Sequence, residues 1–134
     1  MRILMVGTGY VGLVSGACFS DFGHDVVCLD KDAAKIEALR HGEIPIWEPG
    51  LDALVAANVK AGRLSFTTDL AESAKDAEVI FIAVGTPSRR GDGFADLSYV
   101  FGAAREIAGV MNGFTVVVTK STVPVGTGDE VERI

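Results

Sequence analysis

Cysteine and histidine are scarce in this sequence, with two of each among 134 residues. Cys18 and Cys28 stand alone, and neither belongs to a CxxC spacing of the kind found in redox motifs and zinc sites. Two isolated cysteines make neither a disulfide framework nor a set of metal ligands. The sequence therefore predicts no metal site, and we expect both thiols to be small buried apolar groups.

A long apolar run is absent as well. The run that precedes Gly7 has about five residues, whereas a membrane-spanning helix needs about 20 and the core of a signal peptide at least about seven. We therefore expect a cytoplasmic chain without a membrane partner.

Basic residues are in the minority, with 12 Lys and Arg against 18 Asp and Glu and a net charge of −6. A negative chain is repelled by phosphate backbones and anionic lipids, which disfavours nucleic acids and membranes as partners. A local basic cluster could still bind a single phosphate group. Apolar residues, in contrast, make up 49% of the chain, enough for one core and one domain over residues 1–134.

The first 30 residues carry the clearest pattern. A short apolar strand over residues 2–6 leads into the glycine motif GTGYVG, an amphipathic helix and a second strand that ends at Asp30. This order is typical of a dinucleotide-binding βαβ unit. Asp30 is expected to accept both ribose hydroxyls of an adenosine.

Each glycine of the motif has a predicted role. Gly7 permits a tight turn, Gly9 has no Cβ to keep a pyrophosphate from the backbone, and Gly12 lets the helix lie close to the sheet. The pyrophosphate is expected on free N–H groups at the positive end of that helix.

Alternating strands and helices continue along the chain. Strands are predicted over residues 64–66, 79–84 and 114–119, and helices over residues 10–22 and 32–40, from Pro49, from Asp69, from Asp96 and over residues 129–134. The pattern predicts an α/β fold of the Rossmann type, a doubly wound parallel sheet of strand order 3-2-1-4-5 with helices on both faces. The helix that starts at residue 129 has no continuation, so we expect a fragment of a longer protein.

Helical spacing predicts which side chains face the core. These are Val11, Val14, Cys18 and Phe22 in the first helix, Ile36 and Leu39 in the second, Leu51, Leu54, Val55 and Val59 in the third, and Leu97, Val100, Ala104, Ile107 and Ala108 in the helix after Asp96. The third of these helices and residues 42–50 before it form an insertion. The insertion covers a site or meets a partner, or else its Trp47 only fills space in the packing.

In an open sheet of this order, ligands bind across the carboxyl ends of the first and fourth strands. Residues 7–12 and 85–87 should therefore face one crevice. Thr86 is placed there to hydrogen-bond the cofactor, or else it serves the turn. Lys31 is interpreted as a solvated charge, whereas Lys35, one helical turn further on, can approach the cofactor. Arg89 and Arg90 could meet a phosphate, a partner subunit or only solvent.

Five segments together carry a resemblance to a known family. They are GTGYVG at residues 7–12, Asp30, IPIWEPGL at residues 44–51, FIAVGTP at residues 81–87 and KSTVPVG at residues 120–126. Over the whole chain they are similar to the NAD-binding domain of the UDP-glucose/GDP-mannose dehydrogenase family, and most of all to UDP-glucose 6-dehydrogenases. GDP-mannose 6-dehydrogenases are close sisters.

The resemblance implies the activity of the full-length enzyme. Two NAD-dependent oxidations convert the C6 alcohol of UDP-glucose into the carboxylate of UDP-glucuronate, the second through a thiohemiacetal on a catalytic cysteine. Neither Cys18 nor Cys28 matches that cysteine. It lies in later segments, with the assisting lysine and aspartate, a central helix and the UDP-sugar domain, so this fragment alone is expected to be inactive. Family members commonly dimerise through the central helix, so a homodimer is expected at full length.

The resemblance also implies site residues. The cofactor-binding residues would be Gly7, Gly9, Tyr10, Val11, Gly12, Asp30, Lys35, Thr86, Ser121 and Thr122. Thr122 would have a catalytic role too, helping to hold a water molecule near the reaction centre, or else it only caps the turn before Pro124. A different class of protein stays open, a non-catalytic nucleotide-sensing Rossmann module, although such a module requires neither the EPGL insertion nor the KSTVP segment.

Overall fold

The computed structural model describes residues 1–134, which form one five-stranded sheet with helices on both sides. In chain order the elements are β1 (Arg2–Val6), α1 (Tyr10–Asp21), β2 (Asp25–Leu29), α2 (Ala33–Arg40), α3 (Leu51–Lys60), β3 (Leu64–Thr67), α4 (Leu70–Ala74), β4 (Val79–Ile82), α5 (Ser98–Val110), β5 (Val116–Thr119) and α6 (Thr127–Arg133). All strand pairs are parallel and the order is β3-β2-β1-β4-β5. The predicted Rossmann-type topology is confirmed.

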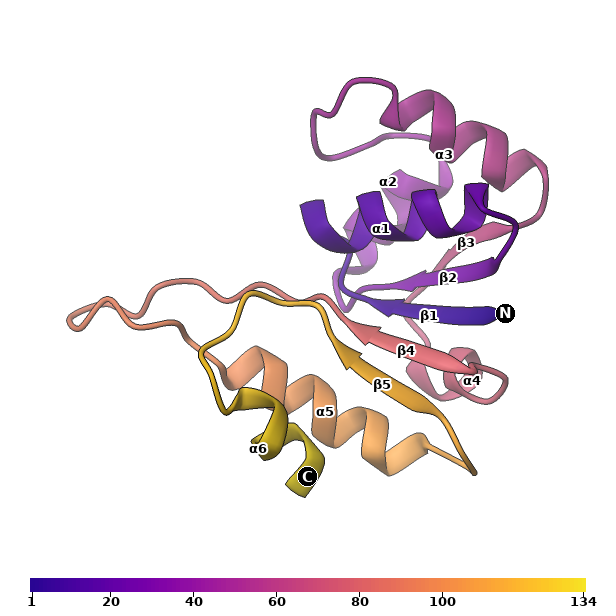
Figure 1. Cartoon of the computed structure of the whole chain (residues 1–134). Helices are drawn as coiled ribbons and strands as arrows, with labels where there is room; N and C mark the ends of the chain where they lie inside the picture. Colours follow the sequence, from indigo (N-terminus) through magenta and orange to yellow (C-terminus); the bar gives the residue numbers. More distant parts are fainter.

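Two layers of helices enclose the sheet (Figure 1). Helices α1, α2 and α3 pack on one face, and α4, α5 and α6 on the other. Side chains of β1 alternate between the layers: Ile3 and Met5 join the first core, and Leu4 and Val6 the second. A strand covered on both faces has no solvent side, which is why its sequence is a continuous apolar run.

The packing face of α1 differs from the prediction. Phe22 lies just beyond the helix and is 75% exposed, and Val11 is 40% exposed. The buried positions are instead Gly12, Leu13, Gly16, Ala17 and Ser20. A Cβ on Gly16 would lie 2.7 Å from the Sγ atom of Cys28, so α1 rests too close to β2 for larger side chains.

Two other helices also depart from the predicted faces. In α3 the predicted inward positions Leu51 and Val55 are confirmed, and Leu54 packs against the same core. Val59 is instead 42% exposed, and the polar residue Asn58 is fully buried. Asn58 donates to the Leu54 carbonyl and accepts from Arg63, so its polar groups are satisfied inside the protein. In α5 the buried set is Val100, Ala103, Ala104 and Ile107; Ala108 is exposed, and Leu97 caps the helix. The inward positions predicted for α2, Ile36 and Leu39, are confirmed.

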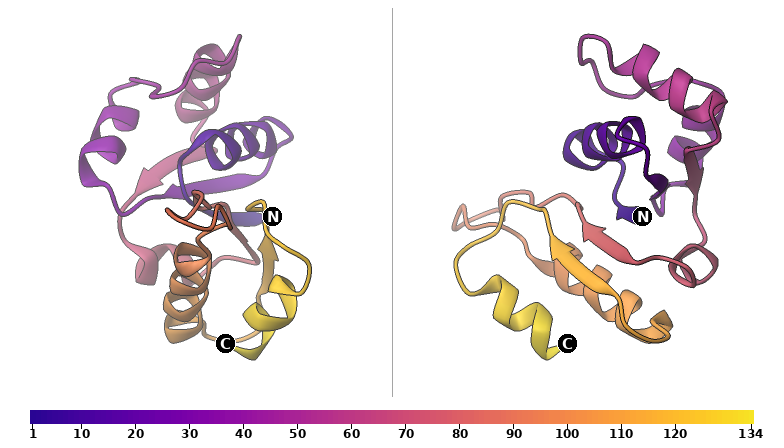
Figure 2. Two further views of the ribbon diagram at one scale, coloured as in Figure 1. Left: turned by 90° about the vertical axis from the view of Figure 1, so that its left-hand side faces the viewer. Right: turned by 45° about the vertical axis from the view of Figure 1, so that its right-hand side comes forward.

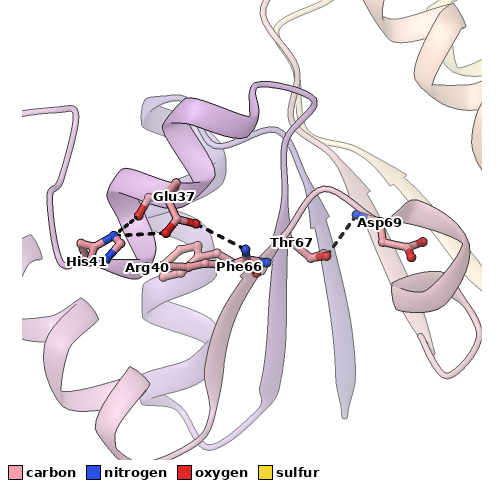
Figure 3. A network of polar contacts seen from close by, with 6 residues as sticks. All are labelled: Glu37, Arg40, His41, Phe66, Thr67 and Asp69. Carbon is pink, nitrogen blue, oxygen red and sulfur yellow. Dashed lines mark hydrogen bonds and ion pairs between the residues drawn. The ribbon is translucent and has the colours of Figure 1, made fainter.

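Side chains from α2 hold the end of β3 (Figure 3). Arg40 donates from Nε and Nη2 to the carbonyl of Phe66, at 3.2 and 3.0 Å. The next residue, Thr67, accepts from the backbone N–H of Asp69 through its hydroxyl and from that of Asp30 through its carbonyl. These contacts fix the end of β2 at which Asp30 lies.

Three irregular segments surround the carboxyl ends of the strands (Figure 2). The insertion of residues 42–50 arches beside the N-terminus of α1, and the segment between β4 and α5 projects from the body. The segment after β5 runs alongside the start of that projecting segment. None of the helices is both long and apolar enough to span a membrane.

Candidate dinucleotide-binding cleft

A cleft of about 630 Å³ opens at the carboxyl ends of β1, β2 and β4. Its walls come from Gly7 to Gly9, from the end of β2 at Asp30, from Gly85 and Pro87 after β4, and from one face of α5. The predicted meeting of the glycine motif and the segment after the fourth strand in one crevice is confirmed.

Gly7 and Gly12 shape the turn that enters the cleft. Gly7 has a φ of +108°, and a Cβ there would lie 2.4 Å from the carbonyl oxygen of Ala83. A Cβ on Gly12 would lie only 1.9 Å from the carbonyl oxygen of Gly7. Both positions therefore exclude any side chain on steric grounds.

Gly9 differs from the other two, because a Cβ there would meet no atom within 4 Å. Gly9 lines the cleft and is the N-cap of the 12-residue helix α1, and as a glycine it has no side chain that could cap the helix. The first turn of α1 contains no acidic residue. Its N–H groups lack partners within the helix and carry a partial positive charge, so they suit an anion.

Three hydrogen bonds orient Asp30 at the edge of the cleft. Its Oδ2 atom accepts from the backbone N–H of Thr8 at 3.0 Å and from the hydroxyl of Thr8 at 2.7 Å. Its Oδ1 atom accepts from the N–H of Asp32 at 3.0 Å. These bonds use three of the roughly four acceptor positions of a carboxylate. One ribose hydroxyl can therefore bind without displacing an internal bond, fewer than the two that the sequence predicted.

The charge state of Asp30 follows from the same contacts. Partial burial raises the pKa of Asp30, but the hydrogen bonds from Asp32 and Thr8 and the ammonium of Lys35 outweigh burial, so its pKa lies below the usual value. Asp30 is thus an anion at neutral pH.

The two lysines after Asp30 behave differently. Lys35 lines the cleft, as predicted, and its Nζ atom lies 3.6 Å from Oδ2 of Asp30. Lys31 was expected to be only solvated, but it forms an ion pair with Glu106 of α5, and both residues line the cleft.

Several residues of the cleft were not found from the sequence. Thr8 is fully buried and orients Asp30, and the parallel register that pairs Val6 with Leu29 would have indicated its position. Leu70, Gly102 and Ala103 line the cleft from α4 and α5. Their small or apolar side chains leave a slot beside Asp30, but no local signal in the sequence links these helices to Asp30.

Tyr10 and Val11 do not line the cleft with their side chains. The Tyr10 hydroxyl donates to Oε2 of Glu48 at 2.5 Å, which raises the pKa of Tyr10 and ties α1 to the insertion. Any contact of these two residues with a phosphate would therefore come from their backbone N–H groups.

Thr86, Ser121 and Thr122 lie together beyond the lined part of the cleft. Thr86 donates its hydroxyl hydrogen to the carbonyl of Thr122 at 3.0 Å, and Ser121 donates to the carbonyl of Val84 at 2.8 Å. The hydroxyls of Thr86 and Ser121 therefore join the segments after β4 and β5. The Thr122 residue itself is exposed.

Arg89 and Arg90 stand on the projecting segment, outside the cleft. Arg89 forms an ion pair with Asp92 at 2.8 Å and lies over the ring of Phe94 at 5.9 Å. The sequence indicated a phosphate, a partner subunit or solvent as the surroundings of Arg89. It did not predict this contact within the loop of Arg89 itself.

Comparison with known proteins agrees with this geometry. Residues 1–134 match the UDP-glucose/GDP-mannose dehydrogenase family, NAD binding domain. The chain is 73% identical over its full length to a UDP-glucose 6-dehydrogenase of Rhizobium meliloti and 53% identical over 99% of its length to TuaD, a UDP-glucose 6-dehydrogenase of Bacillus subtilis. It spans only 31% and 29% of these relatives.

A solved structure shows the same likeness. The GDP-mannose dehydrogenase of Pseudomonas aeruginosa, crystallised as a ternary complex, superposes with a TM-score of 0.92 at 42% identity. The match covers 98% of this chain and 30% of that protein.

Proposed function

The chain belongs to the UDP-glucose/GDP-mannose dehydrogenase family, whose NAD-binding domain it matches from end to end, and we propose that it is the cofactor domain of a UDP-glucose 6-dehydrogenase. The observation that carries this proposal is a single cleft lined by the uncapped start of α1 and by the ionised Asp30. The first offers hydrogen-bond donors to a pyrophosphate, and the second offers an acceptor to a ribose hydroxyl.

The pyrophosphate would lie against Gly9. That glycine leaves the backbone open on the cleft side, and the first-turn N–H groups of α1, including those of Tyr10 and Val11, are free to donate. Gly7 and Gly12 would contribute by shaping the turn.

The adenosine would lie between the end of β2 and α5. Asp30 would accept a hydroxyl of its ribose, with Lys35 beside the carboxylate at 3.6 Å. Gly102 and Ala103 leave space on the α5 side for a flat base. A ribose with a 2′-phosphate would set two anions against each other, which supports NAD over NADP.

The nicotinamide end would reach the segments that Thr86 and Ser121 join. When bound, NAD supplies a hydride acceptor for the oxidation of an alcohol carbon. The chain's own contribution there is Thr122, an exposed residue whose hydroxyl can accept one hydrogen bond and donate another, as a group that holds a water molecule must. Thr86 fixes the backbone of Thr122 through its hydrogen bond to the carbonyl.

UDP-glucose is the substrate that the comparisons favour. Identity is 73% to a UDP-glucose 6-dehydrogenase and 42% to the GDP-mannose dehydrogenase of known structure. The proposed product is UDP-glucuronate, formed by two oxidations. We assign the nucleophilic cysteine, its lysine and aspartate, the central helix and the sugar-nucleotide domain to parts of the protein outside residues 1–134. A homodimer and a cytoplasmic location stay predictions for the full-length protein.

Calorimetric titration tests the proposal directly. The 134-residue chain should bind NAD with one site and release no NADH when UDP-glucose is added, because the covalent step needs groups that it lacks. The full-length protein should form two NADH for each UDP-glucose and none with GDP-mannose. Failure of the chain to bind NAD would refute the assignment of the cleft, and turnover of GDP-mannose instead would refute the substrate.

A further inference from the structure

An ion pair crosses the cleft at its adenosine end. Lys31 follows Asp30 at the end of β2, and its ammonium group pairs with the carboxylate of Glu106, which lies 75 positions away on α5. Both residues line the cleft, so the pair connects two of its opposite walls.

The pair stands at a defined place in that cleft. Lys31 adjoins Asp30 in sequence, and Glu106 lies one helical turn beyond Gly102 on the face of α5 that lines the cleft. It therefore bridges the slot between the ribose-binding carboxylate and the small residues of α5. The side chains of Lys31 and Glu106 are 76% and 46% exposed, which puts the bridge at the solvent side of the slot.

We propose that Lys31 and Glu106 form a clasp over the adenosine of a bound dinucleotide, a role that rests on the proposed NAD-binding function. In this proposal the adenosine enters and leaves past the bridge, so the pair must open for entry and for release. Because the pair is already formed in the ligand-free protein, it favours the closed cleft in both states. An interaction that is equal in the free and bound states changes rates of passage but cancels from the affinity.

The size of the effect follows from the exposure of the pair. Exposed ion pairs shift an equilibrium by about two- to fivefold, and salt screens them. Variants Lys31→Met and Glu106→Gln should therefore each speed association and release by about two- to fivefold, with the dissociation constant unchanged within about twofold. The double variant should be no faster than either single one, whereas Lys31→Arg should keep the slow rates.

A matched control is present at the C-terminal end of α4. Lys75 and Glu72 form an ion pair of similar exposure, 65% and 71%, and neither residue lines the cleft. Lys75→Met should leave both rates unchanged.

Stopped-flow fluorescence with NADH as the probe and the 134-residue chain decides the matter. The rate differences should appear at low ionic strength and shrink at about 0.5 M KCl, where the Debye length is only a few ångströms. Equal rates in the Lys31→Met, Glu106→Gln and Lys75→Met variants would overturn the clasp. Faster release with unchanged association would overturn it too, since that pattern belongs to a direct cofactor contact. If the original chain binds no NADH, the proposed function and the clasp are both refuted. If it binds NADH, but the Lys31 and Glu106 variants have the same rates as the original chain, the clasp alone is refuted.

Discussion

Thr8 donates two hydrogen bonds to one oxygen atom of Asp30, from its backbone N–H at 3.0 Å and from its hydroxyl at 2.7 Å. Thr8 belongs to the glycine turn after β1, and Asp30 to the end of β2. The carboxylate is thus oriented before any ligand binds. Binding therefore costs less side-chain conformational entropy.

Replacement of Thr8 by valine should lower both stability and cofactor affinity. The valine keeps the shape of this fully buried side chain but removes a hydrogen bond to a charged group, which is worth about 1.5–3 kcal/mol. Urea unfolding should show a loss of that size, and calorimetry should show weaker NAD binding. Thr8→Ser keeps the hydroxyl and serves as the control. An unaltered free energy of unfolding in Thr8→Val would contradict this role.

Asp30 should also make stability depend on pH. Its folded pKa lies below the unfolded value of about 3.9, so its ionised form stabilises the folded state above that pH, and the contribution is lost as pH falls through the folded pKa. The difference in unfolding free energy between the unaltered chain and Asp30→Asn should therefore be constant between about pH 5 and 7 and shrink below about pH 4. A constant difference down to pH 3 would mean that the pKa of Asp30 is not lowered.

NAD should bind much more tightly than NADP. Two like charges about 4 Å apart cost roughly 4 kcal/mol at an effective dielectric constant of 20, before any rearrangement. Titration with both cofactors measures the difference, and Asp30→Ala should weaken NAD and narrow the preference. Equal affinities in the unaltered chain would remove Asp30 from the ribose site.

Gly9 and Gly12 should respond differently to alanine. Gly12→Ala places a Cβ 1.9 Å from the Gly7 carbonyl oxygen, and we expect a loss of about 3 kcal/mol or more in unfolding free energy. Gly9→Ala meets no atom within 4 Å, so the thermal midpoint should hardly change while NAD affinity falls about tenfold or more through weaker phosphate contacts. Normal NAD binding by Gly9→Ala would place the pyrophosphate elsewhere.

Thr122→Ala in the full-length enzyme should lower turnover by about ten- to a thousandfold, the range for groups that position a reacting water or an oxyanion. Because Thr122 is exposed, the thermal midpoint of the Thr122→Ala enzyme should differ little from that of the unaltered enzyme. Ser121→Ala is the contrasting variant, since it loses the 2.8 Å bond to Val84 and should be less stable. A Thr122→Ala enzyme with normal turnover would remove this residue from the reaction.

The topology could be predicted from the sequence because the order of strands, glycines and helices along the chain is typical of few folds. The inward face of α1 did not follow, because hydrophobicity marks Val11 and Phe22, whereas close packing selects small residues such as Gly16. The burial of Asn58 was not predicted, for a related reason. A buried amide is satisfied only by partners that tertiary structure brings to it, here the Leu54 carbonyl and Arg63.

The cleft was predicted in part on the same grounds. Asp30 and Lys35 follow a strand end, which marks them as ligand-facing from the pattern alone. The opposite wall comes from α5. Hydrophobic periodicity indicates which face of α5 is buried, but it does not indicate how far Gly102 or Glu106 lies from β2. Long polar side chains add to the difficulty. Their partners, such as Glu48 for Tyr10, depend on how an insertion folds back over α1.

Because α1 lies so close to β2, the reactivity of Cys28 reports how often α1 separates from the sheet. Complete burial raises the pKa of its thiol to about 12, and the helix backbone at Gly16 covers the sulfur. A thiol reagent can reach Cys28 only after α1 has lifted from the sheet, whereas Cys18 is partly accessible in the folded chain. In a Cys18→Ala background, the rate of alkylation therefore counts how often the βαβ unit separates, and a dinucleotide held by that unit should slow the reaction.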